Sequence, residues 1–377
     1  MADKSTLEKM VSIASIRTSF KDKKVLLTGH TGFKGSWLLQ ILAYCGARVT
    51  GLALAPEKPE DLYNQIDGDS LCAESVIHDI RDADFVQQLI LRVQPDFIFH
   101  LAAQPLVLKG YQDPLYTYAV NTLGTAHVLD ALRFLPHPCV AVMVTTDKVY
   151  ENPDDGTHFK ETDPLGGYDP YSASKAACEL IIASYRNSFF SNATLDIHRK
   201  SIVSVRAGNV IGGGDYADHR IIPDIIRALH RGEDIVLRNP NSTRPWQHVL
   251  EPLAIYLELA CRMVHEPGRW NSAYNIGPLP EDVLSVEDLT REAIQIAGRG
   301  RIRIEQNSKQ PHEAALLMLD VGRIQEELGW KPVYSAKEAI EQTISWYFET
   351  DDAGSRCLRQ IKSFFGDTIE GDQNGDL

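Results

Sequence analysis

Two hydroxyls, a carboxylate and an ammonium directly follow a run of five apolar residues in this chain. The run is 140–144, and the residues after it are Thr145, Thr146, Asp147 and Lys148. An apolar run without alternation predicts a strand buried on both faces, as in parallel sheets. Because ligands of open α/β sheets bind at the carboxyl ends of strands, these groups could hold a substrate and exchange protons with it. The alternative is a solvated strand end.

A tyrosine and a lysine four residues apart open the helical pattern that follows. They are Tyr171 and Lys175, in the stretch PYSASK. At this spacing two side chains share one face of a helix. A tyrosine and a lysine at this spacing are common by chance. The pair is informative here because it follows the strand at 140–144, in a chain that begins with a glycine loop.

That loop reads TGHTGFKG at 28–35, where the first predicted strand meets the first predicted helix. Glycines let a backbone turn tightly and approach a pyrophosphate, whose charge is favoured at a helix N-terminus. The spacing is G-x-x-G-x-x-G and not the usual G-x-G-x-x-G, but its place predicts a dinucleotide site. We expect the cofactor to contact six loop residues: Gly29, Thr31, Gly32, Phe33, Lys34 and Gly35.

The end of the second predicted strand does not choose between NAD and NADP. The strand at 47–54 runs into Ala55 and Pro56, without the carboxylate that usually binds the adenosine ribose. No arginine stands there for a 2′-phosphate either, which favours NAD weakly. Asp79 and Ile80 follow a possible third strand and are expected to border the adenine.

Strands alternate with helices of 10–20 residues from Lys23 to about Arg206, which predicts βαβ units. The expected fold is α/β, a Rossmann-type doubly wound parallel sheet with a smaller mixed C-terminal substrate-binding domain. The dinucleotide domain would span 21–205 with a returning segment near 250–278. The substrate domain would comprise 206–249 and 279–365. Residues 1–20 are expected to form a poorly ordered leader, and the polar C-terminal tail is expected to fray.

Composition narrows the class of protein. The formal net charge is −13 without a basic block, so a nucleic-acid partner is not expected. No stretch approaches the length of a membrane span, and the N-terminus does not resemble a signal peptide, so we expect a cytoplasmic protein. The six cysteines have no metal-ligand spacing; we expect buried free thiols and no metal.

Together these stretches resemble the extended branch of the short-chain dehydrogenase/reductase family. The resemblance is carried by the loop at 28–35, HLAAQ at 100–104, VNTLGT at 120–125, YSASK at 171–175 and RAGNVIGGGD at 206–215. It implies a catalytic set of Thr146, Tyr171 and Lys175, which removes a hydride from a sugar carbon. It also extends the expected cofactor contacts to Leu101, Ala102, Ala103, Gln104, Asn121, Thr145, Tyr171 and Lys175.

The triplet Thr146-Asp147-Lys148 is similar to the nucleotide-sugar 4,6-dehydratases within that branch. The deoxythymidine-linked and guanosine-linked members carry Thr-Asp-Glu, with Asp as the acid and Glu as the base. Lysine in the third place is similar to the members that act on CDP-glucose. RPWQHVLEP at 244–252 and PHEAALLMLD at 311–320 agree. The resemblance implies NAD as cofactor, a nucleotide-sugar substrate (CDP-glucose) and a homodimer or homotetramer assembled through helices at 115–135 and 171–190. Substrate contacts are expected from Asn209, Arg220, Arg244 and His248.

Alternatives remain at this stage. A 4-epimerase or another 4,6-dehydratase would share the fold, although Asp147 argues against the first and Lys148 against the second. A non-catalytic dinucleotide sensor would typically lack Tyr171 or Lys175. Lys148 is interpreted either as the base for the carbon 5 proton or as an electrostatic stabiliser of an enolate. His248 is interpreted either as a ligand contact or as a packed structural histidine.

Overall fold

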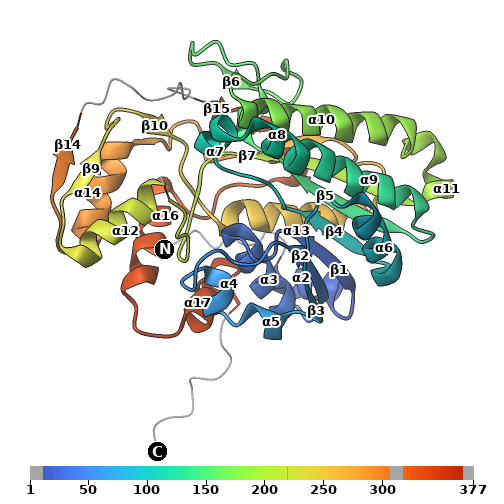
Figure 1. The fold of residues 1–377 in the computed structure, drawn as a ribbon, viewed down its shortest axis with the longest axis horizontal. Coiled ribbons are helices and arrows are strands. Elements are labelled where there is room, and N and C mark those ends of the chain that lie inside the picture. The colour runs from blue at the N-terminus through green and yellow to red at the C-terminus, as the bar shows by residue number, and fades with distance from the viewer. Residues whose placement is uncertain (1–11, 219, 306–316, 368–377) are drawn as a thin grey trace, which may run out of the picture.

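The architecture is a seven-stranded parallel sheet covered by helices on both faces (Figure 1). The structure is a computed structural model, which describes residues 12–218, 220–305 and 317–367. The strand order is β12-β7-β5-β4-β1-β2-β3, and every neighbouring pair is parallel. The strands are β1 Lys24–Thr28, β2 Arg48–Ala53, β3 Glu74–Ile77, β4 Phe97–His100, β5 Cys139–Val144, β7 Lys200–Ala207 and β12 Ala273–Ile276. The predicted Rossmann-type doubly wound parallel sheet is confirmed.

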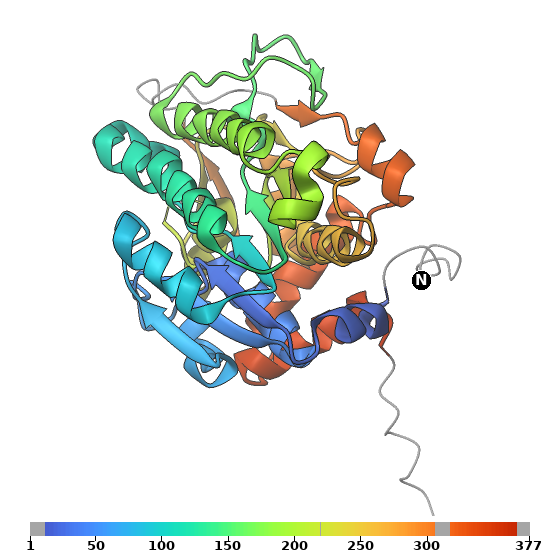
Figure 2. The same cartoon turned by 90° about the vertical axis from the view of Figure 1, so that its right-hand side faces the viewer.

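Alternate residues of each strand enter two separate cores, because successive side chains point to opposite faces of a sheet. In β1, Leu26 joins the core under α6 (Ala83–Val93), α9 (Gly124–Phe134) and α10 (Pro170–Ser188). Its neighbours Val25 and Leu27 join the larger core under α3 (Phe33–Tyr44), α13 (Leu250–His265) and α16 (Ala336–Phe348). Figure 2 shows the helices arranged on the two sides of the sheet. All six residues of β5 are buried, as expected for a strand covered on both faces.

The expectation of a poorly ordered leader over 1–20 is wrong for its last part. Helix α2 spans Ile13–Phe20, and Ser12 caps it by accepting a hydrogen bond from the amide of Ser15. Ile13, Ile16 and Phe20 are buried, and the Phe20 ring lies 4.4 Å from that of Phe97 in β4. Their spacing forms an apolar stripe at helical period, so burial against the sheet orders the segment. Residues 1–11 lie outside the described residues.

The long helix expected at 115–135 is interrupted. It consists of α8 (Pro114–Tyr118), a π-helical turn at Ala119–Leu123, and α9. In this turn the carbonyl of Asn121 accepts a hydrogen bond from Cys178 Sγ of α10 at 3.1 Å. Single π turns inside helices often occur at functional sites. This one carries Asn121, one of the predicted cofactor residues.

The C-terminal part adds small strand pairs and helices beyond the carboxyl edge of the sheet. The pairs are β8 (Val210–Ile211) with β11 (Gln247–His248), β9 (Ile235–Leu237) with β14 (Ile302–Ile304), β10 (Thr243–Arg244) with β13 (Leu284–Ser285), and β6 (His158–Phe159) with β15 (Met318–Leu319). The segment expected to return near 250–278 contains α13 and β12. The remaining helices are α4 (Leu62–Gln65), α5 (Gly68–Leu71), α7 (Val107–Gln112), α11 (Leu195–His198), α12 (Ile221–Arg231), α14 (Val286–Ala297), α15 (Gly322–Leu328) and α17 (Ala353–Phe364), with 3₁₀ turns at Asp147–Val149 and Asn192–Thr194.

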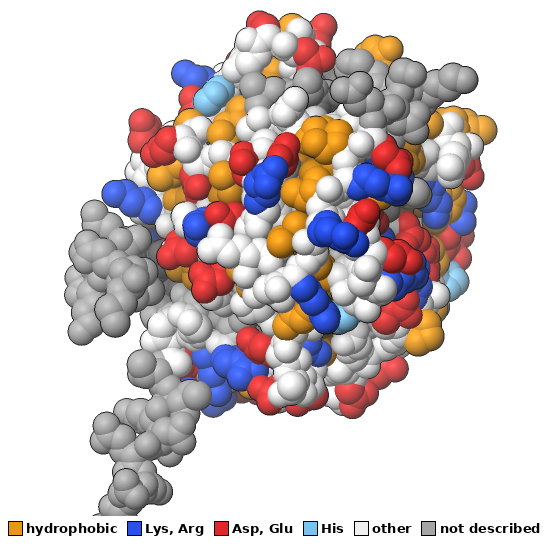
Figure 3. All heavy atoms as spheres, turned by 90° about the vertical axis from the view of Figure 1, so that its left-hand side faces the viewer, with side chains coloured by type: hydrophobic (Ala, Val, Ile, Leu, Met, Phe, Trp, Pro, Cys, Tyr) orange, Lys and Arg blue, Asp and Glu red, His pale blue; other side chains and the backbone are white. Residues whose placement is uncertain are grey.

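The surface and the cysteines agree with the composition. On the face seen in Figure 3, acidic and basic side chains are interspersed. All six cysteines are free thiols, and five of them are buried, as predicted; Cys72 is half-buried. Across 12–218, 220–305 and 317–367, no helix combines the length and apolar character that a membrane crossing requires.

Candidate active site

The four polar residues after β5 form a compact group at the carboxyl edge of the sheet. Thr146 Oγ1 donates a hydrogen bond to Asp147 Oδ1 at 2.8 Å, and Lys148 Nζ lies 3.5 Å from the same oxygen. Asp147 is buried, and its Oδ2 has no hydrogen-bond partner among the described residues. This oxygen faces Gly208 after β7, where a methyl group would lie 3.3 Å from it. One carboxyl oxygen is therefore available to a ligand.

Helix α10 brings Tyr171 and Lys175 to the same group. Asp169 caps the helix by accepting hydrogen bonds from the amides of Tyr171 (2.9 Å) and Ser172 (3.0 Å). Lys175 Nζ donates to the carbonyl of Val144, the last residue of β5, at 3.2 Å. The Thr146 side chain also acts on the Tyr171 phenol and lowers its pKa. The structure thus brings together all five residues that the sequence proposed as catalytic.

Burial dominates the electrostatics of this pair. Burial raises the pKa of Tyr171 above its usual value, while the Lys148 cation, the hydrogen bond with Thr146 and the Arg220 cation act in the opposite direction. Burial also lowers the pKa of Lys175, against the fields of Cys178 and Glu179. The protein's own groups therefore leave the Tyr171 phenol protonated at neutral pH. For Tyr171 to act as a base near neutral pH, further positive charge is needed beside it.

The glycine loop forms a cradle that fits a dinucleotide. Gly29 has φ +75°, and a methyl group on it would lie 2.8 Å from the amide nitrogen of Ala102. A methyl group on Gly35 would overlap the carbonyl oxygen of Gly29 at 2.0 Å. Gly32 precedes α3 without a side-chain cap, so the first amides of this helix keep their donors for an anion. Thr31 Oγ1 donates to the carbonyl of Leu54 at 2.8 Å and holds the loop against the end of β2.

The segment after β4 is fixed by Asn121 from the π turn. The Asn121 side chain accepts from the amide of Gln104 (2.8 Å) and donates to the carbonyl of Gln104 (3.1 Å) and to Ser174 Oγ (2.8 Å). Asn121 therefore joins the β4 loop to α10. Leu101, Ala102 and Ala103 of that loop are half-buried beside Gly29.

Lys34 and Asp79, two further residues expected at the cofactor, have different partners. Lys34 Nζ donates to Tyr256 Oη at 3.4 Å. Burial, followed by the fields of Arg220 and Lys175, lowers the pKa of Lys34 to about 7. Asp79 instead pairs with Arg81 at 2.7 Å, while Ile80 is buried against Gly124 of α9.

Two of the proposed substrate residues adjoin the catalytic group. The Arg220 guanidinium pairs with Asp215 at 2.8 Å, and its field acts on Tyr171. Asn209 follows Gly208, and its Oδ1 is buried without a hydrogen-bond partner among the described residues. Arg244 is half-buried, and its Nη1 donates to the carbonyl of Thr243 at 3.0 Å.

His248 is a correction, because the structure supports its packed interpretation. The ring is completely buried, with edge contacts to Trp37 at 5.9 Å and Tyr334 at 5.6 Å between ring centroids. Its Nδ1 accepts from the amide of Leu250, and burial lowers its pKa to about 3. A ligand cannot reach this side chain without displacing part of the core.

Buried residues that local sequence patterns did not indicate support the site from behind. Glu179 and Arg206 form a buried ion pair of 2.9 Å beneath Thr145, and Asp215 anchors Arg220. One signal was present, since Glu179 follows Lys175 by four residues and so shares its helix face. Arg206 follows only from the fold, because β7 lies beside β5.

A family model described as GDP-mannose 4,6 dehydratase matches residues 26–343. The chain belongs to this family. A CDP-glucose 4,6-dehydratase of Salmonella typhimurium is 40% identical over 328 residues, which cover 87% of this chain and 91% of that relative. A dTDP-glucose 4,6-dehydratase of Xanthomonas campestris is 26% identical over 341 residues, covering 85% of this chain and 92% of that protein.

Solved structures of related enzymes share the fold. A dTDP-glucose 4,6-dehydratase of Bacillus anthracis in complex with NAD superimposes with a TM-score of 0.71 at 21% identity, covering 89% of this chain and 99% of that one. A UDP-glucose 4-epimerase of Thermotoga maritima gives 0.71 at 20% identity, covering 86% and 98%. Family membership confirms the resemblance to nucleotide-sugar 4,6-dehydratases that the sequence motifs indicated.

Proposed function

We propose that the protein is an NAD-dependent hydro-lyase that converts CDP-glucose to CDP-4-keto-6-deoxyglucose and water. The observation that carries this proposal is the pairing of Asp147 with Lys148 beside Thr146 at the end of β5, within reach of Tyr171. An epimerase on this fold needs no acid at that position. The 40% identical relative named for CDP-glucose supports the choice of nucleotide.

Tyr171 would remove the proton of the sugar hydroxyl at carbon 4, and Thr146, whose side chain acts on Tyr171, would orient that hydroxyl. NAD, held by the glycine cradle, supplies hydride acceptance from carbon 4 and hydride donation at carbon 6. Because the protein alone leaves Tyr171 protonated, the positive nicotinamide is the additional charge that favours its phenolate. Lys175, fixed by the carbonyl of Val144, would place a second cation beside it.

Asp147 and Lys148 would serve the elimination. A ketone at carbon 4 acidifies the proton on carbon 5. Lys148 would take that proton while Asp147, through its open Oδ2, gives a proton to the departing carbon 6 hydroxyl. The electron pair of the carbon 5–hydrogen bond forms the carbon 5–carbon 6 double bond, and water leaves. Hydride addition at carbon 6 and return of a proton to carbon 5 complete the product.

The finer predictions about substrate and assembly also belong to this proposal. Arg220 and Arg244 would bind the diphosphate, since a guanidinium pairs bidentately with phosphate oxygens, and Asn209 would contact the sugar. The division into a cofactor domain at 21–205 and a substrate domain at 206–249 and 279–365 remains a prediction. The same holds for a cytoplasmic location and for a homodimer or homotetramer. Exposed Leu115, Leu123 and Leu180 on α8, the π turn and α10 are compatible with assembly through these helices.

The test is a panel of CDP-, dTDP-, GDP- and UDP-glucose, with loss of water detected by mass spectrometry and epimers of equal mass distinguished by proton NMR. We expect a 4-keto-6-deoxy product with CDP-glucose and at least tenfold lower kcat/KM with the others. CDP-galactose as the product would instead indicate an epimerase. Binding of NAD without turnover of any sugar would indicate a dinucleotide sensor.

A further inference from the structure

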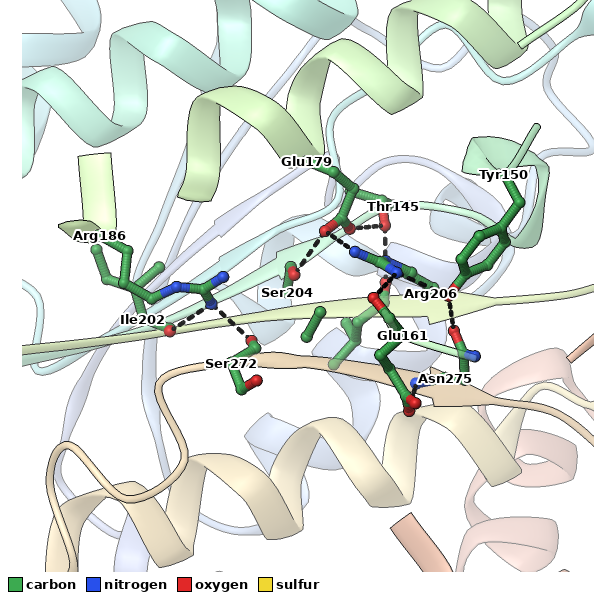
Figure 4. A network of polar contacts seen from close by, with 12 residues as sticks. Thr145, Tyr150, Glu161, Glu179, Arg186, Ile202, Ser204, Arg206, Ser272 and Asn275 are labelled. Atoms are coloured by element: carbon green, nitrogen blue, oxygen red, sulfur yellow. Dashed lines mark hydrogen bonds and ion pairs between the residues drawn. The ribbon is translucent and has the colours of Figure 1, made fainter. Parts of the chain in front are cut away.

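A buried carboxylate lies directly behind the catalytic group. Glu179 of α10 is 2% exposed and accepts three hydrogen bonds (Figure 4). Thr145 Oγ1 donates to one oxygen at 2.5 Å, and Ser204 Oγ and Arg206 Nη2 each donate to the other at 2.9 Å. The carboxylate thus joins α10 to the ends of β5 and β7.

Arg206 extends this network away from the site. Its Nη1 donates to Tyr150 Oη at 2.7 Å and to the carbonyl of Glu161 at 3.1 Å. Tyr150 in turn donates to Asn275 Oδ1 of β12 at 2.5 Å. Figure 4 shows the guanidinium between the Glu179 carboxylate and the Tyr150 ring. Arg206, the cation that pairs with Glu179, is therefore held in place by further hydrogen bonds.

The position of Glu179 in the helix relates it to the redox pair. Tyr171, Lys175 and Glu179 recur every four residues and share the inward face of α10. Glu179 binds Thr145, whose neighbour Thr146 acts on the Tyr171 phenol. Lys175 binds the carbonyl of Val144, one residue before Thr145. Lys175 and Glu179, one helical turn apart on α10, thus bind two consecutive residues at the end of β5.

Glu179 also sets the charge around Lys175. The groups whose fields couple to this amine are Cys178 and Glu179 of α10, Lys34 of α3 and His100 of β4. Burial opposes ionisation of Glu179, but the Arg206 cation and the hydrogen bonds from Arg206, Thr145 and Ser204 outweigh it and lower its pKa. Burial raises the pKa of Cys178, which stays a neutral thiol. Glu179 is therefore the anion of this set.

A purely structural role explains this arrangement poorly. Burying two charges costs several kcal/mol per ion, and apolar replacements of buried pairs are often neutral or stabilising. We propose that Glu179 is a positioning residue for the redox step, which aligns Thr145 and Thr146 on α10 and keeps Lys175 a cation. This inference rests on the proposed function, because it takes Tyr171 and Lys175 as the redox pair.

The test is the pH profile of kcat/KM for CDP-glucose in Glu179→Gln, which keeps the shape of the side chain and removes its charge. Loss of the anion makes protonated Lys175 less stable, so activity should be lost at lower pH on the basic side of the profile. We expect the basic limb to move down by about one pH unit. Turnover should fall about tenfold with KM for CDP-glucose nearly unchanged. A purely structural role would lower the melting temperature and leave the basic limb in place.

Ser204→Ala is the matched control, because it removes one hydrogen bond from the same carboxylate and keeps the charge. Its basic limb should superimpose on that of the wild type. Glu179→Gln leaves the Arg206 cation without its partner, so Glu179→Gln combined with Arg206→Met provides a variant that buries neither charge. It should show a downward shift in the same direction but smaller, since loss of the Arg206 cation offsets part of the effect of losing the Glu179 anion on Lys175.

An unchanged basic limb in the folded single or double variant would overturn the inference. Tyr171→Phe, assayed in parallel, separates this result from a failure of the proposed function. If Tyr171→Phe abolishes turnover while the basic limb of the Glu179 variants is unchanged, only the role of Glu179 is wrong. If Tyr171→Phe keeps full activity, the proposed redox pair itself is wrong.

Discussion

Gly29 and Ala102 approach each other so closely that a methyl group on Gly29 would lie 2.8 Å from the amide nitrogen of Ala102. Gly29 ends the first strand and opens the glycine loop, while Ala102 follows β4. Because β1 and β4 are parallel neighbours, their carboxyl ends meet at one edge of the sheet. The contact fixes two walls of the proposed cofactor cradle against each other.

Gly29→Ala should therefore lose NAD binding. The added methyl meets backbone atoms, which cannot move aside as a flexible side chain can, and φ of +75° is itself unfavourable for alanine. We expect the dissociation constant for NAD, measured by isothermal titration calorimetry, to rise at least tenfold. Gly232→Ala is the control, because Gly232 also has a positive φ (+67°) but nothing within 4 Å of the added carbon. Gly232→Ala should lower the free energy of unfolding by about 1 kcal/mol and leave NAD affinity unchanged. Equal losses of NAD affinity in the two variants would show that the clash with Ala102 is not the cause.

Tyr171→Phe should abolish most of the turnover and preserve the fold. The ring is buried at the start of α10 and would still pack, so the melting temperature and NAD affinity should stay close to the wild-type values. A positioned base contributes roughly two to four orders of magnitude in rate, so kcat should fall at least 100-fold. Near-normal kcat would remove Tyr171 from the mechanism.

Local patterns in the sequence were sufficient for the sheet and for most of the catalytic group. The apolar run before Thr145 and the glycine loop at 28–35 each depend on residues that are neighbours in the chain. Because carboxyl ends of parallel strands converge, the fold class alone predicts that these stretches meet. The apolar stripe of α2 was equally visible and shows that a charged N-terminal segment can still pack.

Tertiary contacts decided the features that the sequence did not reveal. Arg206 pairs with Glu179 across 27 positions, and no local pattern links them. His248 lies in a stretch rich in polar residues, but Trp37 and Tyr334 from distant helices and loops enclose it. The π turn at Asn121 likewise depends on α10, whose Cys178 binds its carbonyl. Such residues need the packed structure for their interpretation.

Three buried histidines should make the folded state sensitive to acid. Burial lowers the pKa of His30 to about 4 and those of His100 and His248 to about 3. Below about pH 6.5 the unfolded chain binds protons that the folded protein rejects, so stability is present above 6.5 and is lost as the pH falls toward 3. Each histidine contributes a slope of about 1.4 kcal/mol per pH unit in this window.

Glu251 acts in the opposite direction in part of the same range. Burial raises its pKa to about 8, so the stability that it contributes is present below 4.5 and is lost as the pH rises toward 8. His248→Gln should lower the free energy of unfolding at pH 7. Between pH 6.5 and 4.5 that free energy should fall less steeply with decreasing pH, by the slope that corresponds to about one proton. Urea unfolding at several pH values measures this slope; an unchanged slope in His248→Gln would show that His248 titrates normally.

The last prediction concerns Lys148, whose amine lies 3.5 Å from Asp147 Oδ1. An amine can take the carbon 5 proton only when neutral, and free lysine has a pKa near 10.4. An ionised Asp147 would hold the ammonium charged, whereas a protonated Asp147, which the expulsion of water requires, removes that attraction. The positive nicotinamide and coverage by the sugar would further favour the neutral amine. We therefore favour Lys148 as the base and consider electrostatic stabilisation of an enolate the alternative.

Lys148→Met separates these roles, because Met keeps an unbranched side chain without the amine. With CDP-glucose in deuterium oxide, the variant should still oxidise carbon 4 in a single turnover, seen as NADH absorbance. It should fail to exchange the carbon 5 proton with solvent, as measured by mass spectrometry of the recovered sugar. Asp147→Asn is the matched control, since loss of the acid should stall water release and leave exchange at carbon 5 detectable. Exchange at the wild-type rate in Lys148→Met, with water loss stalled, would place the base elsewhere and leave Lys148 as a stabilising charge.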